Sequence, residues 1–148
     1  MQRTPLLLSR IMGRGAALDP HVEVVTLQAG GTHRQTLQST WDRANQIASA
    51  LSEHGIGIGD RVASFMWNNY RHLELYQGVT SMGAVLHTLN IRLGPADLEY
   101  IIHHAQDRII FADEDLLPLL DPVLDNIPSV EMPVSYTHPE PTRQEAIS

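Results

Sequence analysis

The sequence contains no cysteine and no lysine, and each absence removes a class of chemistry. Without cysteine there is no disulfide, no thiolate nucleophile and no sulfur metal site. All ten basic residues are arginine, so a phosphate-loop lysine and a Schiff-base lysine are excluded as well. The lack of cysteine is typical of a reducing compartment, and we therefore expect a cytoplasmic protein.

Long apolar runs and an excess of positive charge are also missing. No run approaches the roughly 18–20 apolar residues of a membrane span, so we expect no transmembrane segment. The apolar stretch Leu6-Leu7-Leu8 is far shorter than a signal-peptide core of about 7–15 residues. The net charge of −7 argues against a surface for nucleic acid or for anionic membranes.

What is present is the pattern of one globular α/β domain. The 148 residues are 43% hydrophobic and 18% charged. A short helix after Thr4 and Pro5, ended by Gly13 and Gly15, precedes a hairpin whose turn is Ala29–Thr32. Amphipathic helices and apolar strands then alternate three times before one more helix. This order predicts a mostly parallel sheet with helices on its faces. The expected segments are helices near 37–51, 70–83, 95–105 and 113–124, and strands at 21–27, 32–36, 61–66, 84–89 and 108–112.

The glycine-rich stretch His54–Asp60 raises the question of a phosphate-binding loop. A dinucleotide loop follows a strand and opens a helix. Here the glycines close a helix that Thr36 caps, and they precede the strand that begins at Arg61. Because no helix N-terminus follows the glycines, we interpret them as a connector, with Gly55 as the left-handed residue after the helix.

The eight histidines require a metal site to be considered. His103 and His104 are adjacent on a predicted helix and do not form the i, i+4 pair of a helical zinc site. His72 and His87 have no acidic or histidine partner at ligand spacing. We expect these side chains to be solvated or hydrogen-bonded, and we assign no metal ligand.

Asp113, followed by Glu114 and Asp115, comes directly after a predicted strand, at the end where α/β sheets bind ligands. A phosphoacceptor aspartate of a receiver domain would look similar, but receiver chemistry also uses a lysine. We favour a helix cap followed by first-turn acids. No Gly-x-Ser-x-Gly elbow is present, and Ser64 and Ser81 lie in a strand pattern and near a helix end. We therefore assign no catalytic or cofactor-binding residue.

Residues 129–148 form a different kind of segment, with three prolines and no sustained period. Val130–Val134 has the composition to begin a strand, which Pro133 restricts to an edge or a strand end. We interpret the segment as an irregular, disordered tail outside the family pattern described next, and residues 1–128 as the structured part.

Several stretches together are similar to the AMP-forming medium- and long-chain fatty acyl-CoA synthetases. The opening Met1–Leu8, the connector Gly55–Val62 and the segment Ser81–Leu93 resemble that family, the last of them in its fatty-acyl form. Asn68–Tyr76 and Asp107–Asp113 also fit. Leu37, Ser39 and the pair Gln77-Gly78 depart from the family pattern. The resemblance covers about Thr4 to Ile127.

The resemblance implies a fold, an activity and partners. Intact members convert fatty acid, ATP and CoA to acyl-CoA, AMP and pyrophosphate, using a glycine-rich ATP loop, a magnesium-binding glutamate and a catalytic lysine. None of these lies in the matched stretches. We therefore expect the N-terminal scaffold fragment of such a ligase, an incomplete part of its large N-terminal domain. Such a fragment is expected to bind no cofactor and to lack activity, with the rest of the synthetase as its partner. The alternative is a non-catalytic partner-binding or dimerisation module.

Overall fold

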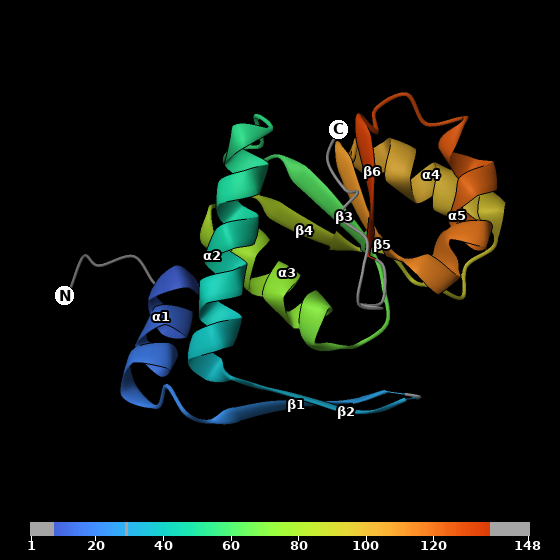
Figure 1. The fold of residues 1–148 in the computed structure, drawn as a ribbon. Coiled ribbons are helices and arrows are strands. Elements are labelled where there is room, and N and C mark those ends of the chain that lie inside the picture. Colours follow the sequence, from blue (N-terminus) through green and yellow to red (C-terminus); the bar gives the residue numbers. More distant parts are fainter. Residues whose placement is uncertain (1–7, 29, 137–148) are drawn as a thin grey trace.

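The computed structural model describes residues 8–28 and 30–136, and it has the predicted α/β architecture (Figure 1). An antiparallel hairpin, β1 (Glu23–Gln28) and β2 (Gly31–Thr36), precedes the main sheet. The main sheet has the strand order β4-β3-β5-β6, and its strands pair in parallel. The strands are β3 (Arg61–Phe65), β4 (Val85–Thr88), β5 (Ile109–Asp113) and β6 (Met132–Tyr136).

Two apolar cores lie on opposite faces of this sheet. Helices α4 (Pro95–Ala105) and α5 (Leu117–Leu124), which follows the 3₁₀ turn Glu114–Leu116, pack on one face. Helices α2 (Leu37–Glu53) and α3 (Tyr70–Ser81) pack on the other face (Figure 1). All five residues of β5 are buried, as expected for a strand covered on both faces. In the part of the chain that the structure describes, no helix is long and apolar enough to cross a membrane.

The first helix is longer than predicted. Helix α1 spans Leu8–Leu18 and continues through Gly13 and Gly15, which we expected to end it. An added Cβ at Gly13 would lie 3.4 Å from the Trp41 ring, and one at Gly15 would lie 3.6 Å from Leu37. Both positions thus lie against α2 with room for ordinary contacts, and the two glycines do not stop the helix. Thr4 and Pro5 lie outside the described residues.

The connector interpretation of the glycine stretch is confirmed. The Thr36 side chain accepts a hydrogen bond from the backbone N–H of Ser39 and caps α2, as predicted. Gly55 has a φ of +76°, which places it in the left-handed region just after α2. The N–H of Gly57 donates to Asp60 at 2.8 Å, and this bond, together with Arg108, lowers the pKa of Asp60. The stretch lies at the amino end of β3 and opens no helix.

The buried face of α3 differs from the prediction. The spacing of Leu73, Tyr76 and either Val79 or Thr80 predicts one apolar face; Val79 is fully buried, yet Tyr76 is 44% exposed. The buried positions instead include Arg71, Glu74 and Gly78. The apolar spacing did not predict the buried face correctly, because this helix buries charged and small residues that contact other elements.

Strand β6 occupies residues that the sequence analysis placed in the irregular tail. Residues 132–136 pair in parallel with β5, so this part of the tail is ordered. Pro133 lies in the outermost strand of the described sheet, where the prediction restricted it. Residues 137–148 lie outside the described residues. Pro122 falls inside α5, which ends two residues later, at the residue where the predicted segment 113–124 also ends.

Candidate functional site

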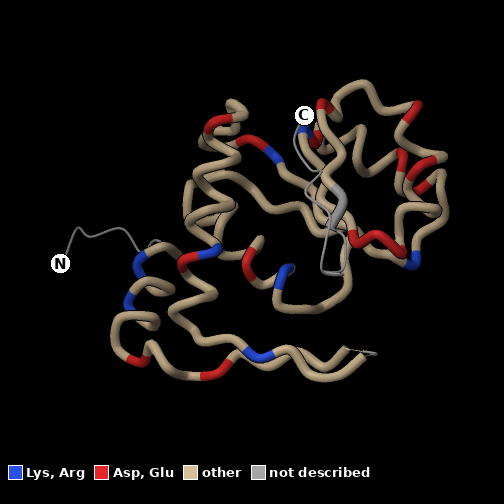
Figure 2. Tube along the Cα trace, in the orientation of Figure 1, with Lys and Arg blue, Asp and Glu red and all other residues tan. Residues whose placement is uncertain are grey.

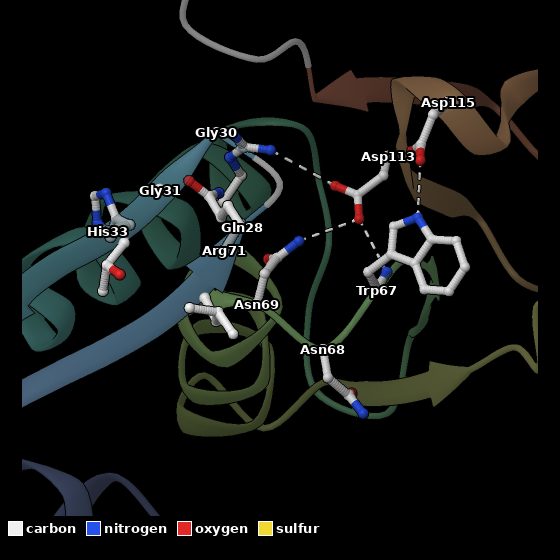
Figure 3. Close-up of a pocket in the computed structure, with 12 residues that line it drawn as sticks. Gln28, Gly30, Gly31, His33, Trp67, Asn68, Asn69, Arg71, Asp113 and Asp115 are labelled. Atoms are coloured by element: carbon white, nitrogen blue, oxygen red, sulfur yellow. Dashed lines mark hydrogen bonds and ion pairs between the residues drawn. The ribbon is translucent and has the colours of Figure 1, made fainter.

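A cavity of about 730 Å³ lies at the carboxyl ends of β3 and β5 (Figure 3). Its walls come from the hairpin turn, from the loop between β3 and α3, and from the end of β5. The lining residues are Leu27, Gln28, residues 30–33, Trp67–Asn69, Arg71, Asp113 and Asp115. Parallel sheets bind ligands at this edge, because the connecting loops gather there.

Asp113 organises one wall of the cavity. Its Oδ2 accepts hydrogen bonds from the backbone N–H of Trp67 at 2.9 Å and from the side-chain amide of Asn69 at 3.2 Å. Its side chain makes no capping hydrogen bond to the helical turn that follows. Asp113 therefore occupies the predicted N-cap position, and Glu114 and Asp115 lie in the first turn as predicted, but the carboxylate turns back toward the β3–α3 loop instead of capping the turn.

Arg71 faces Asp113 across the wall of the cavity (Figure 3). The two side chains are almost fully buried, and Nη1 of Arg71 lies 3.7 Å from Oδ1 of Asp113. The Nε of Arg71 donates to the Tyr70 hydroxyl at 3.1 Å, and the Tyr70 ring stacks on His33. Among the described residues, neither Nη2 of Arg71 nor Oδ1 of Asp113 has a hydrogen-bond partner. The pair therefore depends on mutual charge compensation.

The rim of the cavity is acidic. The Trp67 indole N–H donates to Asp115 at 2.9 Å, and Asp115 is exposed. Figure 2 shows the acidic stretch that follows β5 as continuous. Because Arg71 and Asp113 cancel each other, the remaining charge on this wall is negative. This electrostatic environment disfavours a phosphate or carboxylate ligand.

A buried serine–histidine contact lies beneath the cavity. The ring Nε2 of His72 and the Ser64 hydroxyl are 2.9 Å apart, and both side chains are buried. Burial lowers the pKa of His72, although the Trp67 carbonyl and the charge of Asp113 oppose that shift. Ser64 is fully enclosed, so this contact serves the core and presents no nucleophile to the cavity.

The other histidines are dispersed. His87 contacts Asp107 at 2.7 Å, and burial raises the pKa of that carboxyl while His87 partly offsets the shift. His103 and His104 follow one another near the end of α4, and the His104 ring stacks on Tyr100. Within residues 8–28 and 30–136, no three histidine, aspartate or glutamate side chains gather as metal ligands would.

The sequence reasoning identified the place but not the arrangement. It singled out Asp113 by its position after a strand, and the Asn69 side chain, which caps α3, lines the same cavity. It missed Arg71 and Trp67. An arginine next to a predicted helix start carries no signal of burial, because its partner Asp113 is 42 residues away.

Comparison with known proteins agrees with this architecture. The family model described as "AMP-binding enzyme" matches residues 14–147. The match includes residues 129–147, which we expected to lie outside the family pattern; the domain boundary at residue 128 stays a prediction. A long-chain-fatty-acid–CoA ligase of Thermus thermophilus is 41% identical over 132 residues, covering 88% of this chain and 24% of the ligase. A medium-chain-fatty-acid–CoA ligase of Ectopseudomonas oleovorans is 34% identical, covering 93% of this chain and 26% of that protein.

Solved structures show the same fold. A fatty acyl-CoA synthetase of Mycobacterium tuberculosis superposes with a TM-score of 0.81 at 22% identity, covering 88% of this chain and 26% of that one. The anthranilate CoA ligase AuaEII, solved with anthranoyl-AMP, gives a TM-score of 0.82 at 22% identity, covering 92% and 27%. This chain thus spans about a quarter of the length of the relatives it matches. The family match over most of the chain, together with the shared fold, confirms the resemblance: this chain belongs to the AMP-binding enzyme family.

Proposed function

We propose that this chain supplies the N-terminal scaffold of an AMP-forming fatty acid–CoA ligase. The observation that carries the proposal is the 41% identity over 132 residues to the Thermus thermophilus ligase. The aligned stretch makes up only 24% of that ligase. The intact ligase would convert fatty acid, ATP and CoA to acyl-CoA, AMP and pyrophosphate. We infer a fatty-acyl substrate because both relatives named above are fatty-acid–CoA ligases.

The residues that bind ATP and catalyse the reaction would come from the rest of the ligase. The chain contains no lysine, so it offers no ammonium group to an ATP phosphate. The cavity wall carries Asp115 beside a charge-compensated pair, which does not suit a nucleotide phosphate. We infer that ATP, magnesium and CoA are bound by parts of the fold outside this chain. We also infer a cytoplasmic location, in keeping with the lack of cysteine.

An assay of ATP–pyrophosphate exchange tests the proposal. The purified chain with fatty acid, ATP and magnesium should give no exchange above a blank. A chimera in which this chain replaces the aligned quarter of the Thermus thermophilus ligase should regain exchange, because scaffold is what the chain contributes. Exchange by the chain alone would contradict the proposal. So would a folded chimera without exchange.

A second candidate function is a non-catalytic module that self-associates or binds a partner. The observation that favours it is the two-stranded hairpin β1–β2, which carries the exposed side chains of Val25 and Leu27, the latter 85% exposed. Exposed apolar side chains on a strand that borders a sheet are a typical site of pairing with another chain. Size-exclusion chromatography of the chain distinguishes this module from a scaffold fragment. A sharp elution peak of a folded dimer supports the module, and aggregation supports an incomplete domain.

A further inference from the structure

An apolar groove lies on the sheet face that carries α2 and α3. Its floor is formed by Ile109 and Phe111 of β5 and by Met132 and Val134 of β6, and its wall is formed by α2. The groove has a volume of about 280 Å³. That is just below the roughly 300–1,000 Å³ typical of small-molecule pockets, so packing by side chains fits better than a ligand.

Coverage of the sheet is uneven around this groove. On the opposite face, α4 and α5 pack against β3 and β5. On the groove face, α3 connects β3 to β4 and α2 lies beside it, while no described helix covers β6 (Figure 1). Parallel sheets in α/β proteins are covered by helices on both faces. The part of this face above β6 is the part that lacks a helix among residues 8–28 and 30–136.

We propose that the groove receives the apolar face of an amphipathic helix from the part of the ligase fold that the relatives carry beyond the aligned quarter. This inference rests on the proposed function. The aligned stretch is 24% of the Thermus thermophilus ligase, so most of that fold has to pack against surfaces of this kind. Residues 137–148 do not suit the role, because Ala146 and Ile147 are their only apolar residues besides two prolines.

The connection rules indicate where in the fold this helix belongs. Crossovers between parallel strands are right-handed, so the direction of travel across the sheet decides which face receives the helix. The step from β3 to β4 placed α3 on the groove face. The steps from β4 to β5 and from β5 to β6 run the other way and placed α4 and α5 on the opposite face. A further step beyond β6 in that direction would put its helix beside α5. The covering helix is therefore not the connection from β6 to a next strand in that direction.

The rim of the groove sets the polarity of the partner. Gln46 and Ala50 of α2 and His54 just after it border the groove and are exposed, and Arg43 at one end pairs with Glu74 at 2.7 Å. The partner helix needs an apolar stripe flanked by polar residues, as an amphipathic helix provides.

The absence of native cysteine allows a direct test by thiol labelling. Ala50→Cys places a single thiol in the groove, and Ser49→Cys places one on the next residue of α2, which is exposed and does not line the groove. In the chain alone, both thiols should react with a maleimide at similar rates. In the chimeric ligase, Cys at position 50 should react at least about tenfold more slowly, because a covered thiol reacts only through local opening, while position 49 should be unchanged.

Each result decides the matter. Equal rates at the two positions of a folded chimera would overturn the inference. Protection at position 50 in the chain alone that grows with protein concentration would also overturn it, because the occupant would then be a second copy. Peptide mapping by mass spectrometry separates these thiols from any cysteine of the Thermus portion. If the chimera does not fold, the labelling rates of the two cysteine variants are measured in an equimolar mixture of the chain with the separately produced remainder of the ligase. Thiol labelling is measured independently of pyrophosphate exchange. An uncovered groove can therefore be distinguished from a wrong assignment of the chain to a ligase.

Discussion

Buried charge is concentrated at a few residues, and each is held by a partner from a distant part of the chain. Asp113 receives hydrogen bonds from the β3–α3 loop and faces the guanidinium of Arg71. Removing one member of such a pair leaves the other charge in the interior without compensation, which costs far more than the pair itself contributes.

Asp113→Asn should therefore destabilise the fold strongly. The amide keeps the size of the side chain but removes the charge opposite Arg71, and we expect a loss of about 3 kcal/mol in the free energy of unfolding. Asp115→Asn is the matched control, because Asp115 is exposed and its replacement can still accept from the Trp67 indole; we expect a change within about 0.5 kcal/mol. Urea denaturation measures both. Equal effects would show that Arg71 does not depend on Asp113.

His72 should make stability depend on pH. Burial lowers its pKa below the usual 6.5, so the folded state favours the neutral ring. The stabilising contribution is then fully present above the unfolded pKa and is lost as pH falls from about 6.5 toward the folded pKa. His72→Gln should flatten the decline in stability between pH 7.5 and 5, whereas His103→Gln, at an exposed helical position, should leave it unchanged. Chemical denaturation at several pH values measures the slopes. An unaltered slope in His72→Gln would contradict this prediction.

At the scale of elements, the hairpin and two helices are joined by polar as well as apolar contacts. Glu74 of α3 is fully buried and accepts from Arg43 of α2 at 2.7 Å and from Gln35 of β2 at 3.0 Å. Helices α2 and α3 also approach closely at Gly78, where an added Cβ would lie 2.7 Å from the carbonyl oxygen of Ala44. The small residue sets the distance between the two helices.

Two glycine-to-alanine substitutions should have opposite signs. Gly78→Ala should destabilise the fold by about 1–3 kcal/mol, because the backbone oxygen of Ala44 cannot move away without separating the helices. Gly15→Ala, inside α1, meets only the flexible Leu37 side chain at 3.6 Å and should stabilise by about 0.5–1 kcal/mol through helix propensity. Thermal unfolding followed by circular dichroism compares the two. Stabilisation by both would mean that α2 and α3 are farther apart than described.

At the scale of the whole molecule, the sheet has one apolar core on each face, and some apolar side chains remain exposed at the surface. The α4–α5 face and the α2–α3 face each enclose their own cluster of buried residues. The hairpin projects from the α1–α2 side with its apolar residues exposed (Figure 1). Exposed apolar side chains on a two-stranded hairpin favour association with another chain.

Leu27→Lys should therefore weaken any concentration-dependent association of the chain. Burying one leucine at an interface contributes about 1.5–3 kcal/mol, so the dissociation constant should rise at least about tenfold. Leu119→Lys is the control, because Leu119 is also an exposed leucine but lies on α5, far along the chain from the hairpin. Sedimentation velocity over a range of concentrations measures the change. An equal response to the two substitutions would exclude the hairpin as the contact.

Much of the local structure followed from the sequence by itself. Thr36 marked a helix start, and Gly55 marked a helix end, because capping depends on residues only a few positions apart. The alternation of helices with apolar strands determined the parallel sheet, and the missing lysines excluded whole classes of chemistry. Family membership was also readable from short stretches such as Ser81–Leu93.

The tertiary structure alone decided which polar residues are buried and what they meet. Arg71 and Asp113 are 42 positions apart, and Glu74 pairs with residues of two other elements, so no local period signals their burial. The same holds for Gly78, whose role depends on α3 lying against α2. Capping and periodicity are properties of neighbours in the chain. Burial of charge and close approach between helices are properties of neighbours in space, which exist only once the sheet has assembled.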